Sequence, residues 1–139
     1  MQDVVLLGAS NLVLGWPAMM TALQRLTAEP VRVNIATGMG RSYIKTSAFW
    51  FRQLPSILDC ELWNQLPENL SRPPLVLITD VGNDIVYLYQ PDHIAESVRQ
   101  CISRVRNWRP DAKLVMTGLP LASLRRIGNA RFLIARTIL

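Results

Sequence analysis

Four short apolar runs, separated by longer stretches of helical periodicity, constrain the fold more than any other feature of this sequence. The runs cover residues 4–7, 31–35, 75–79 and 113–117. Three of them are almost continuously apolar, which is typical of strands covered on both faces of a parallel sheet. The sequence therefore predicts four strands joined by helical crossovers.

Helical patterns fill the intervals between the strands. Pro17 suits the first turn of a helix over residues 16–23, and a stronger pattern begins at Pro91. Its apolar positions recur at three- and four-residue spacing: Ile94, Val98, Cys101, Ile102, Val105 and Trp108.

Two further stretches are also predicted to be helical. Residues 43–70 favour two helical pieces that break near Pro55, with Phe51 and Leu54 in the first and Trp63 and Leu66 in the second. A final helix is expected over residues 129–138.

Strands that alternate with helices of this length indicate βαβ units, and hence an α/β fold. We predict a three-layer α/β/α sandwich with a mostly parallel sheet, formed by a single domain over residues 1–139. In such folds the ligand site lies at the carboxyl ends of the strands.

The composition is that of a globular protein, with 50% hydrophobic and 18% charged residues. No apolar run reaches the ~18 residues of a membrane span, and the first strand leaves no room for a leader, so we expect a cytoplasmic protein without a membrane partner. Cys60 and Cys101 lie 41 positions apart, a spacing that predicts two buried thiols rather than a metal site.

The net charge of +5 is unevenly distributed. Residues 1–96 carry a net −3 and residues 97–139 a net +8. A basic interaction module is one interpretation, and solvated helix faces are the other; no aromatic-interleaved motif favours nucleic acid as a partner. The arginines concerned are Arg99, Arg104, Arg106, Arg109, Arg125, Arg126, Arg131 and Arg136.

Small polar residues follow three of the predicted strands. Ser10 lies in the sequence Gly-Ala-Ser-Asn after the first strand, Gly40 in Gly-Met-Gly-Arg-Ser after the second, and Asn83 in Gly-Asn-Asp after the third. A serine beside glycine is accessible as a nucleophile. A glycine N–H and an asparagine amide could form an oxyanion hole with it.

These three blocks resemble those of the SGNH/GDSL hydrolases, esterases and lipases with a flavodoxin-like α/β/α fold. The resemblance covers almost the whole chain. It implies that Ser10 is the nucleophile and a donor through its own N–H, with Gly40 and Asn83 as the other oxyanion donors. Asn11, Gly38 and Asp84 are the candidate substrate-binding residues, and Gly38 is the alternative backbone donor. The implied substrate is a small ester, and no metal or organic cofactor is implied.

The chain departs from the family pattern in three places. Ala9 replaces the usual aspartate of the first block, and Gly82 directly precedes Asn83 where one intervening residue is usual. No Asp-x-x-His block is present, so the sequence supplies no family general base and predicts impaired activity. His93, the chain's one histidine, is expected to be exposed in the first turn of its helix rather than catalytic.

Several alternatives remain open at this stage. Ser10 could simply tighten a strand-to-helix turn, and the Gly8 to Gly15 segment loosely resembles a nucleotide-binding turn. Arg41 either binds an acidic substrate group or braces its loop, and Asp84 either orients a loop or ends a strand.

Three aromatic residues and the end of the sequence lead to two further expectations. Tyr43, Trp50 and Phe51 are expected in the core or lining a groove. The family's fifth strand has no counterpart in this sequence. We therefore expect a truncated or shortened form that self-associates through an exposed sheet edge or the terminal helix.

Overall fold

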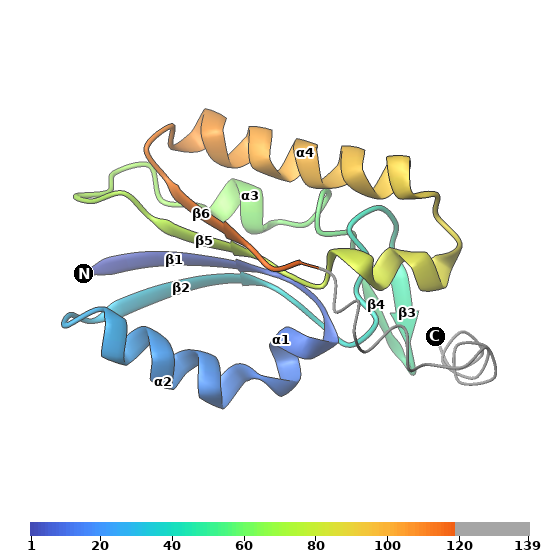
Figure 1. Ribbon diagram of the computed structural model, residues 1–139, viewed down its shortest axis with the longest axis horizontal. Coiled ribbons are helices and arrows are strands. Elements are labelled where there is room, and N and C mark those ends of the chain that lie inside the picture. The colour runs from blue at the N-terminus through green and yellow to red at the C-terminus, as the bar shows by residue number, and fades with distance from the viewer. Residues whose placement is uncertain (119–139) are drawn as a thin grey trace.

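A parallel four-stranded sheet lies at the centre of the computed structural model, which describes residues 1–118 (Figure 1). Its strands are β1 (Gln2–Leu7), β2 (Val31–Ala36), β5 (Leu75–Ile78) and β6 (Lys113–Met116), in the order β2-β1-β5-β6. All three pairings are parallel. The mixed α/β class, the mostly parallel sheet and the positions of the four predicted strands are therefore confirmed.

Strand β1 pairs with a neighbour on each side, since Val4 is level with Val33 of β2 and with Leu75 of β5. Its side chains alternate between two apolar clusters. Val5 and Leu7 belong to one cluster, and Val4 and Leu6 to the other. Because both faces of β1 are buried, the strand is apolar at successive positions rather than at every second one.

Helices lie over both faces of the sheet (Figure 1). Helices α1 (Ser10–Leu14) and α2 (Trp16–Leu26) contribute Leu12 and Leu23 to the cluster that contains Val4. Helices α3 (Leu62–Gln65) and α4 (Pro91–Trp108) cover the other face. The predicted helices at Pro17 and Pro91 are thus confirmed, each with its proline in the first turn.

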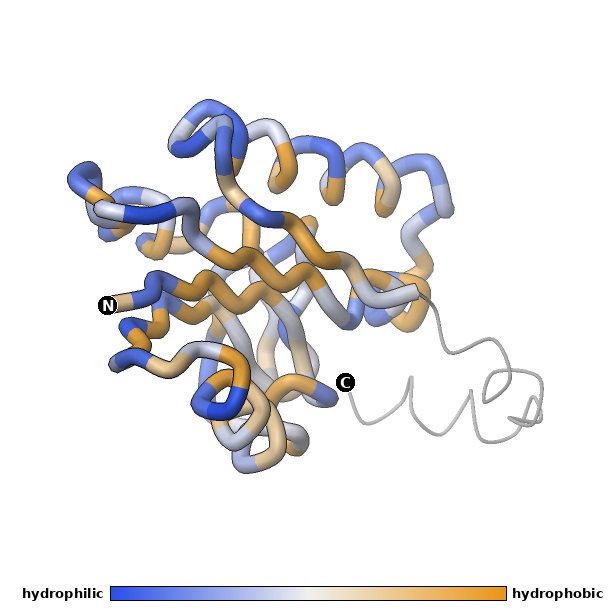
Figure 2. Tube along the Cα trace, turned by 60° about the vertical axis from the view of Figure 1, so that its left-hand side comes forward, coloured by the Kyte–Doolittle hydropathy of each residue, from blue (hydrophilic) through white to orange (hydrophobic). Residues whose placement is uncertain are grey.

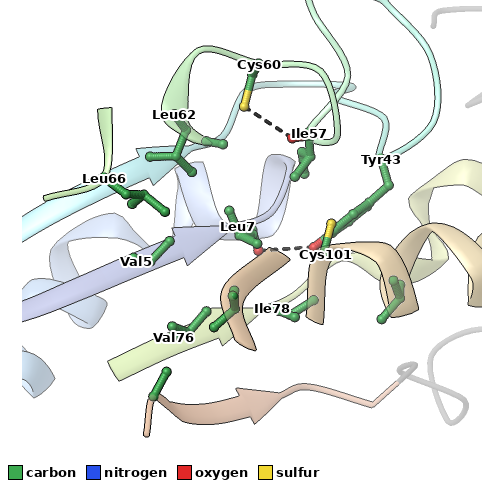
Figure 3. Close-up of a cluster of buried hydrophobic side chains, with 14 residues drawn as sticks. Val5, Leu7, Tyr43, Ile57, Cys60, Leu62, Leu66, Val76, Ile78 and Cys101 are labelled. Atoms are coloured by element: carbon green, nitrogen blue, oxygen red, sulfur yellow. Dashed lines mark hydrogen bonds between the residues drawn. The ribbon is translucent and has the colours of Figure 1, made fainter. Parts of the chain in front are cut away.

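The larger cluster joins β1 and β5 to α4 and to the segment that follows β2 (Figure 3). Both cysteines lie within it, buried and unpaired, as the sequence predicted. Burial raises the pKa of the Cys101 thiol to about 12, and the Cys60 thiol donates to the Ile57 carbonyl.

Helix α4 buries its apolar stripe and turns a hydrophilic face outward (Figure 2). The arginines on that face contact their own chain. Arg99 pairs with Glu96 at 3.0 Å, Arg109 pairs with Asp111 at 2.8 Å, and Arg106 donates to backbone carbonyls. These contacts favour solvated, locally paired helix faces over a dedicated basic surface for this part of the chain.

Arg104, also on α4, donates to the Leu58 carbonyl and lies over the Trp63 ring. The remaining arginines of the basic set lie outside the described residues, and they are Arg125, Arg126, Arg131 and Arg136.

The prediction of a first helical piece between residues 43 and 54 is wrong. This stretch forms a two-stranded antiparallel sheet, β3 (Ser47–Phe49) with β4 (Arg52–Leu54). The turn between them consists of Trp50 and Phe51, without the glycine or asparagine that usually marks a two-residue hairpin turn. The second piece is the short helix α3, and the helix expected over residues 129–138 lies outside the described part of the chain.

Strand β6 occupies one edge of the sheet within residues 1–118. Val115 and Met116 are exposed there, at 58% and 56%. Self-association through this edge stays a prediction. None of the helices in the described region has the length and apolar character needed to cross a membrane.

Leu7, fully buried at the end of β1, offers a test of this core. We expect Leu7→Ala to lower the free energy of unfolding by about 2–5 kcal/mol, because the substitution loses buried area and leaves a cavity. Urea denaturation followed by circular dichroism measures the change. Leu26→Ala is the matched control, since Leu26 is 79% exposed, and an equal loss in both variants would contradict the assignment of the core.

Candidate active site

Three loops that follow β1, β2 and β5 meet at one edge of the sheet, because the carboxyl ends of parallel strands lie at the same edge. The first loop covers residues 8–11 and runs into α1, and the second covers residues 37–43. The third covers residues 80–84 and runs into the 3-10 helix η1 (Val81–Tyr87). The three loops carry Ser10, Gly40 and Asn83, respectively. Hydrogen bonds join every pair of these loops, as the following contacts show.

The carboxylate of Asp80 joins the third loop to the first. Its Oδ2 accepts from the backbone N–H groups of Ala9 at 2.7 Å and Leu12 at 3.3 Å, and its Oδ1 accepts from the Asn11 amide at 2.6 Å. Asp80 itself has φ 59°, in the left-handed region that aspartate tolerates better than most residues. It was not among the predicted site residues, although its position directly after a strand was a usable signal.

Thr37 joins the second loop to the first, and Arg41 braces the second loop itself. The Thr37 hydroxyl donates to the Ala9 carbonyl at 3.0 Å, and Nη1 of Arg41 donates to the Thr37 carbonyl at 3.1 Å. Nε of Arg41 reaches the Pro55 carbonyl at 3.1 Å. Arg41 is 7% exposed, and burial lowers the pKa of its guanidinium. Of the two roles considered for Arg41, the structure supports the bracing of a loop.

Asn83 and Asp84 join the third loop to the second. Nδ2 of Asn83 donates to the Arg41 carbonyl at 3.1 Å. The Asp84 carboxylate is fully buried, where it accepts from the Ser42 hydroxyl and from the Tyr43 N–H at 2.9 Å. Burial raises the pKa of Asp84 in spite of these hydrogen bonds, because removal from water penalises the charged form.

Tyr43 fixes the second loop to the strands themselves. Its hydroxyl lies 3.2 Å from the carbonyl oxygen of Leu7, at the end of β1 (Figure 3), and 2.5 Å from that of Thr79, directly after β5. The ring is fully buried, which confirms the core placement expected for Tyr43 and holds the pKa of its hydroxyl well above the usual value.

The three predicted catalytic residues occupy different surroundings. Ser10 begins α1 and is partly exposed. Gly40 has φ 67°, where a side chain would be strained, and its carbonyl accepts from the Tyr87 hydroxyl at 2.5 Å. The backbone N–H of Asn83 donates to the Asp80 carbonyl at 2.9 Å, and the Asp80 carboxylate accepts from the N–H of Ala9, next to Ser10. Asp80 therefore connects the segments that carry Ser10 and Asn83.

The predicted substrate-binding residues also differ from one another. Asn11 is exposed, with its amide held by Asp80, and Gly38 lines a pocket against Leu54. Asp84 is the exception, because a fully buried side chain with both oxygens bonded is not available to a substrate. Its role here is to orient the second loop.

His93 is exposed in the first turn of α4, as predicted, and its ring lies edge-on to Tyr89 at 6.5 Å between centroids. Within residues 1–118, no three or more His, Cys, Asp or Glu side chains are grouped so as to hold a metal ion.

The first loop is poorly suited to a bound phosphate. A nucleotide-binding turn offers free backbone N–H groups to the phosphate. Here the Asp80 carboxylate accepts from the N–H groups of Ala9 and Leu12, and its negative charge would repel an anion. These contacts disfavour the nucleotide-binding interpretation of the loop.

Comparisons with known proteins add no assignment to this geometry, since no family model and no curated protein matches the chain.

Asp80→Ala tests the link between the first and third loops. We expect it to lower the free energy of unfolding by about 2–4 kcal/mol, because two backbone N–H groups lose a charged acceptor. Asp80→Asn, which tolerates the left-handed backbone and keeps one acceptor oxygen, should lose less. Urea denaturation measures both. A change below about 0.5 kcal/mol in Asp80→Ala would show that the link contributes little.

Asp84→Ala tests the link between the second and third loops. The substitution leaves the Ser42 hydroxyl and the Tyr43 N–H without their acceptor, and we expect a loss of about 2–5 kcal/mol in the free energy of unfolding. Glu68→Ala is the control, because Glu68 is an exposed carboxylate. Thermal and urea unfolding of the two variants should separate them clearly, and similar stabilities would disprove the role of Asp84.

Proposed function

We propose that this chain carries a serine hydrolase site of the SGNH type, which cleaves a small ester. The proposed architecture is a three-layer α/β/α sandwich of the flavodoxin-like kind. It is supported by the strand order β2-β1-β5-β6 and by apolar clusters on both faces of the sheet. One observation carries the functional proposal: hydrogen bonds connect the loops of Ser10, Gly40 and Asn83 in all three pairs.

In the proposed reaction the Ser10 hydroxyl attacks the ester carbonyl, the alcohol leaves with a proton, and water then hydrolyses the acyl-enzyme. Negative charge develops on the carbonyl oxygen during the attack. The proposed donors to it are the backbone N–H groups of Ser10 and Gly40 and the side-chain amide of Asn83. An asparagine amide has two N–H bonds, so Asn83 can hold the Arg41 carbonyl and still donate to the substrate.

Within residues 1–118, the proposed site has a nucleophile without an evident base. A serine hydroxyl is weakly nucleophilic at neutral pH unless a neighbouring group accepts its proton. His93 is exposed on α4 and faces Tyr89, so it has no role in the proposal. We therefore expect slow turnover, which a small base added to the solution should accelerate. The reaction as proposed needs no metal or organic cofactor.

The test is hydrolysis of nitrophenyl butyrate by the wild type and by Ser10→Ala, each measured over a series of imidazole concentrations. Imidazole supplies a general base and also hydrolyses the ester directly, and the Ser10→Ala rate corrects for that background. We expect the wild type to exceed Ser10→Ala by at least about tenfold, because only the serine forms an acyl-enzyme. Ser71→Ala, at an exposed serine in a loop, should match the wild type.

Equal rates for the wild type and Ser10→Ala at every imidazole concentration would reject the proposal. A loss in Ser71→Ala as large as that in Ser10→Ala would also reject it, since the effect would then not depend on the proposed nucleophile.

A further inference from the structure

A pocket of about 530 Å³ lies between the second loop and the hairpin formed by β3 and β4. Thr37, Gly38 and Met39 form one wall, and the hairpin forms the other. The hairpin residues that line it are Trp50, Phe51, Arg52 and Leu54.

The turn of the hairpin combines two energetically unfavourable features, exposed aromatic side chains and a strained backbone. Trp50 is 81% exposed and Phe51 is 98% exposed, so two large aromatic side chains face water. Trp50 also has φ 56°, a left-handed conformation that is strained for a residue with a side chain. Strain and apolar exposure at one turn are typical of a site that binds a ligand.

The pocket shares a wall with the proposed catalytic loops. Thr37 lines the pocket and donates to the Ala9 carbonyl, directly before Ser10. Gly38 lies two residues before Gly40, and a side chain at Gly38 would collide with Leu54 of the hairpin. The absence of a side chain at Gly38 therefore lets the hairpin approach the second loop closely.

We propose that this pocket binds the apolar part of the acyl group, whether chain or ring, of the ester that Ser10 attacks. This inference rests on the proposed function for the identity of the ligand. Met39 and Leu54 offer apolar surface to such a group. Trp50 and Phe51 offer aromatic faces, which a bound ligand would cover and so remove from water. A concave site between the second loop and the hairpin favours a small ligand over a flat lipid surface.

The test measures binding rather than turnover, with hexanoate as the chain probe, phenylacetate as the ring probe and acetate as the short control. Titration followed by the backbone amide signals of ¹⁵N-labelled protein gives both the affinity and the position of binding. We expect hexanoate or phenylacetate to shift the amides of residues 37–39 and 50–54, and acetate to leave them unchanged. Ser10→Ala should bind as the wild type does, so binding is measured independently of the proposed chemistry.

Trp50→Gly is the decisive variant, because glycine relieves the left-handed strain while it removes the aromatic face. We expect its melting temperature to equal or exceed that of the wild type, and its dissociation constant for the bound probe to rise at least about fivefold. Leu26→Ser, which alters a leucine that is 79% exposed and not part of this pocket, should leave the dissociation constant unchanged.

Three results would overturn the inference. The first is that neither probe shifts the amides of residues 37–39 and 50–54. The second is that Trp50→Gly leaves the dissociation constant unchanged, and the third is that the protein binds phosphatidylcholine vesicles through Trp50 but binds neither probe. If Ser10→Ala hydrolyses esters as fast as the wild type but binding to the pocket persists, the proposed function fails while the pocket stands.

Discussion

The Asp80 carboxylate is the contact on which the arrangement of the candidate site depends most. Parallel strands deliver three loops to one edge of the sheet, but a shared edge does not by itself fix the distance between loops. Asp80 accepts from the backbone of the first loop while its own backbone begins the third. A charged acceptor of two N–H groups is stronger than a neutral one, which suits a position that is only partly shielded from water.

The links of the second loop to the first loop, the third loop and the strands differ from one another in how deeply they are buried. Asp84 and Tyr43 are fully buried. Asp84 accepts from the second loop, and Tyr43 ties that loop to the ends of the strands, whereas the partly exposed Thr37 and Asn83 join one loop to another. The loops are thus held by a deep layer and a shallow layer of hydrogen bonds. Ser10, in the first loop, is partly exposed, so a ligand could reach it without any change in the core.

The strands and the two long helices were predictable because burial on both faces produces continuous apolar runs, and because Pro17 and Pro91 mark helix starts. The hairpin could not be predicted, because its local sequence does not look like a hairpin. Phe51 and Leu54 have helical spacing, and the turn carries tryptophan in a conformation that usually selects glycine. Similarly, the blocks around Ser10, Gly40 and Asn83 were visible in the sequence, but the contacts of Asp80 depend on how strands 71 positions apart pair.

The two buried cysteines have a practical consequence. A thiol reacts with alkylating reagents as the thiolate, and Cys101 combines complete burial with a pKa of about 12. Cys60 lies in the same cluster, with its thiol on the Ile57 carbonyl. Alkylation of Cys101 therefore requires the cluster around it to open first. The rate of thiol alkylation in the wild-type chain therefore reports how often this cluster opens. Mass spectrometry can measure that rate without a fluorophore or an isotope label.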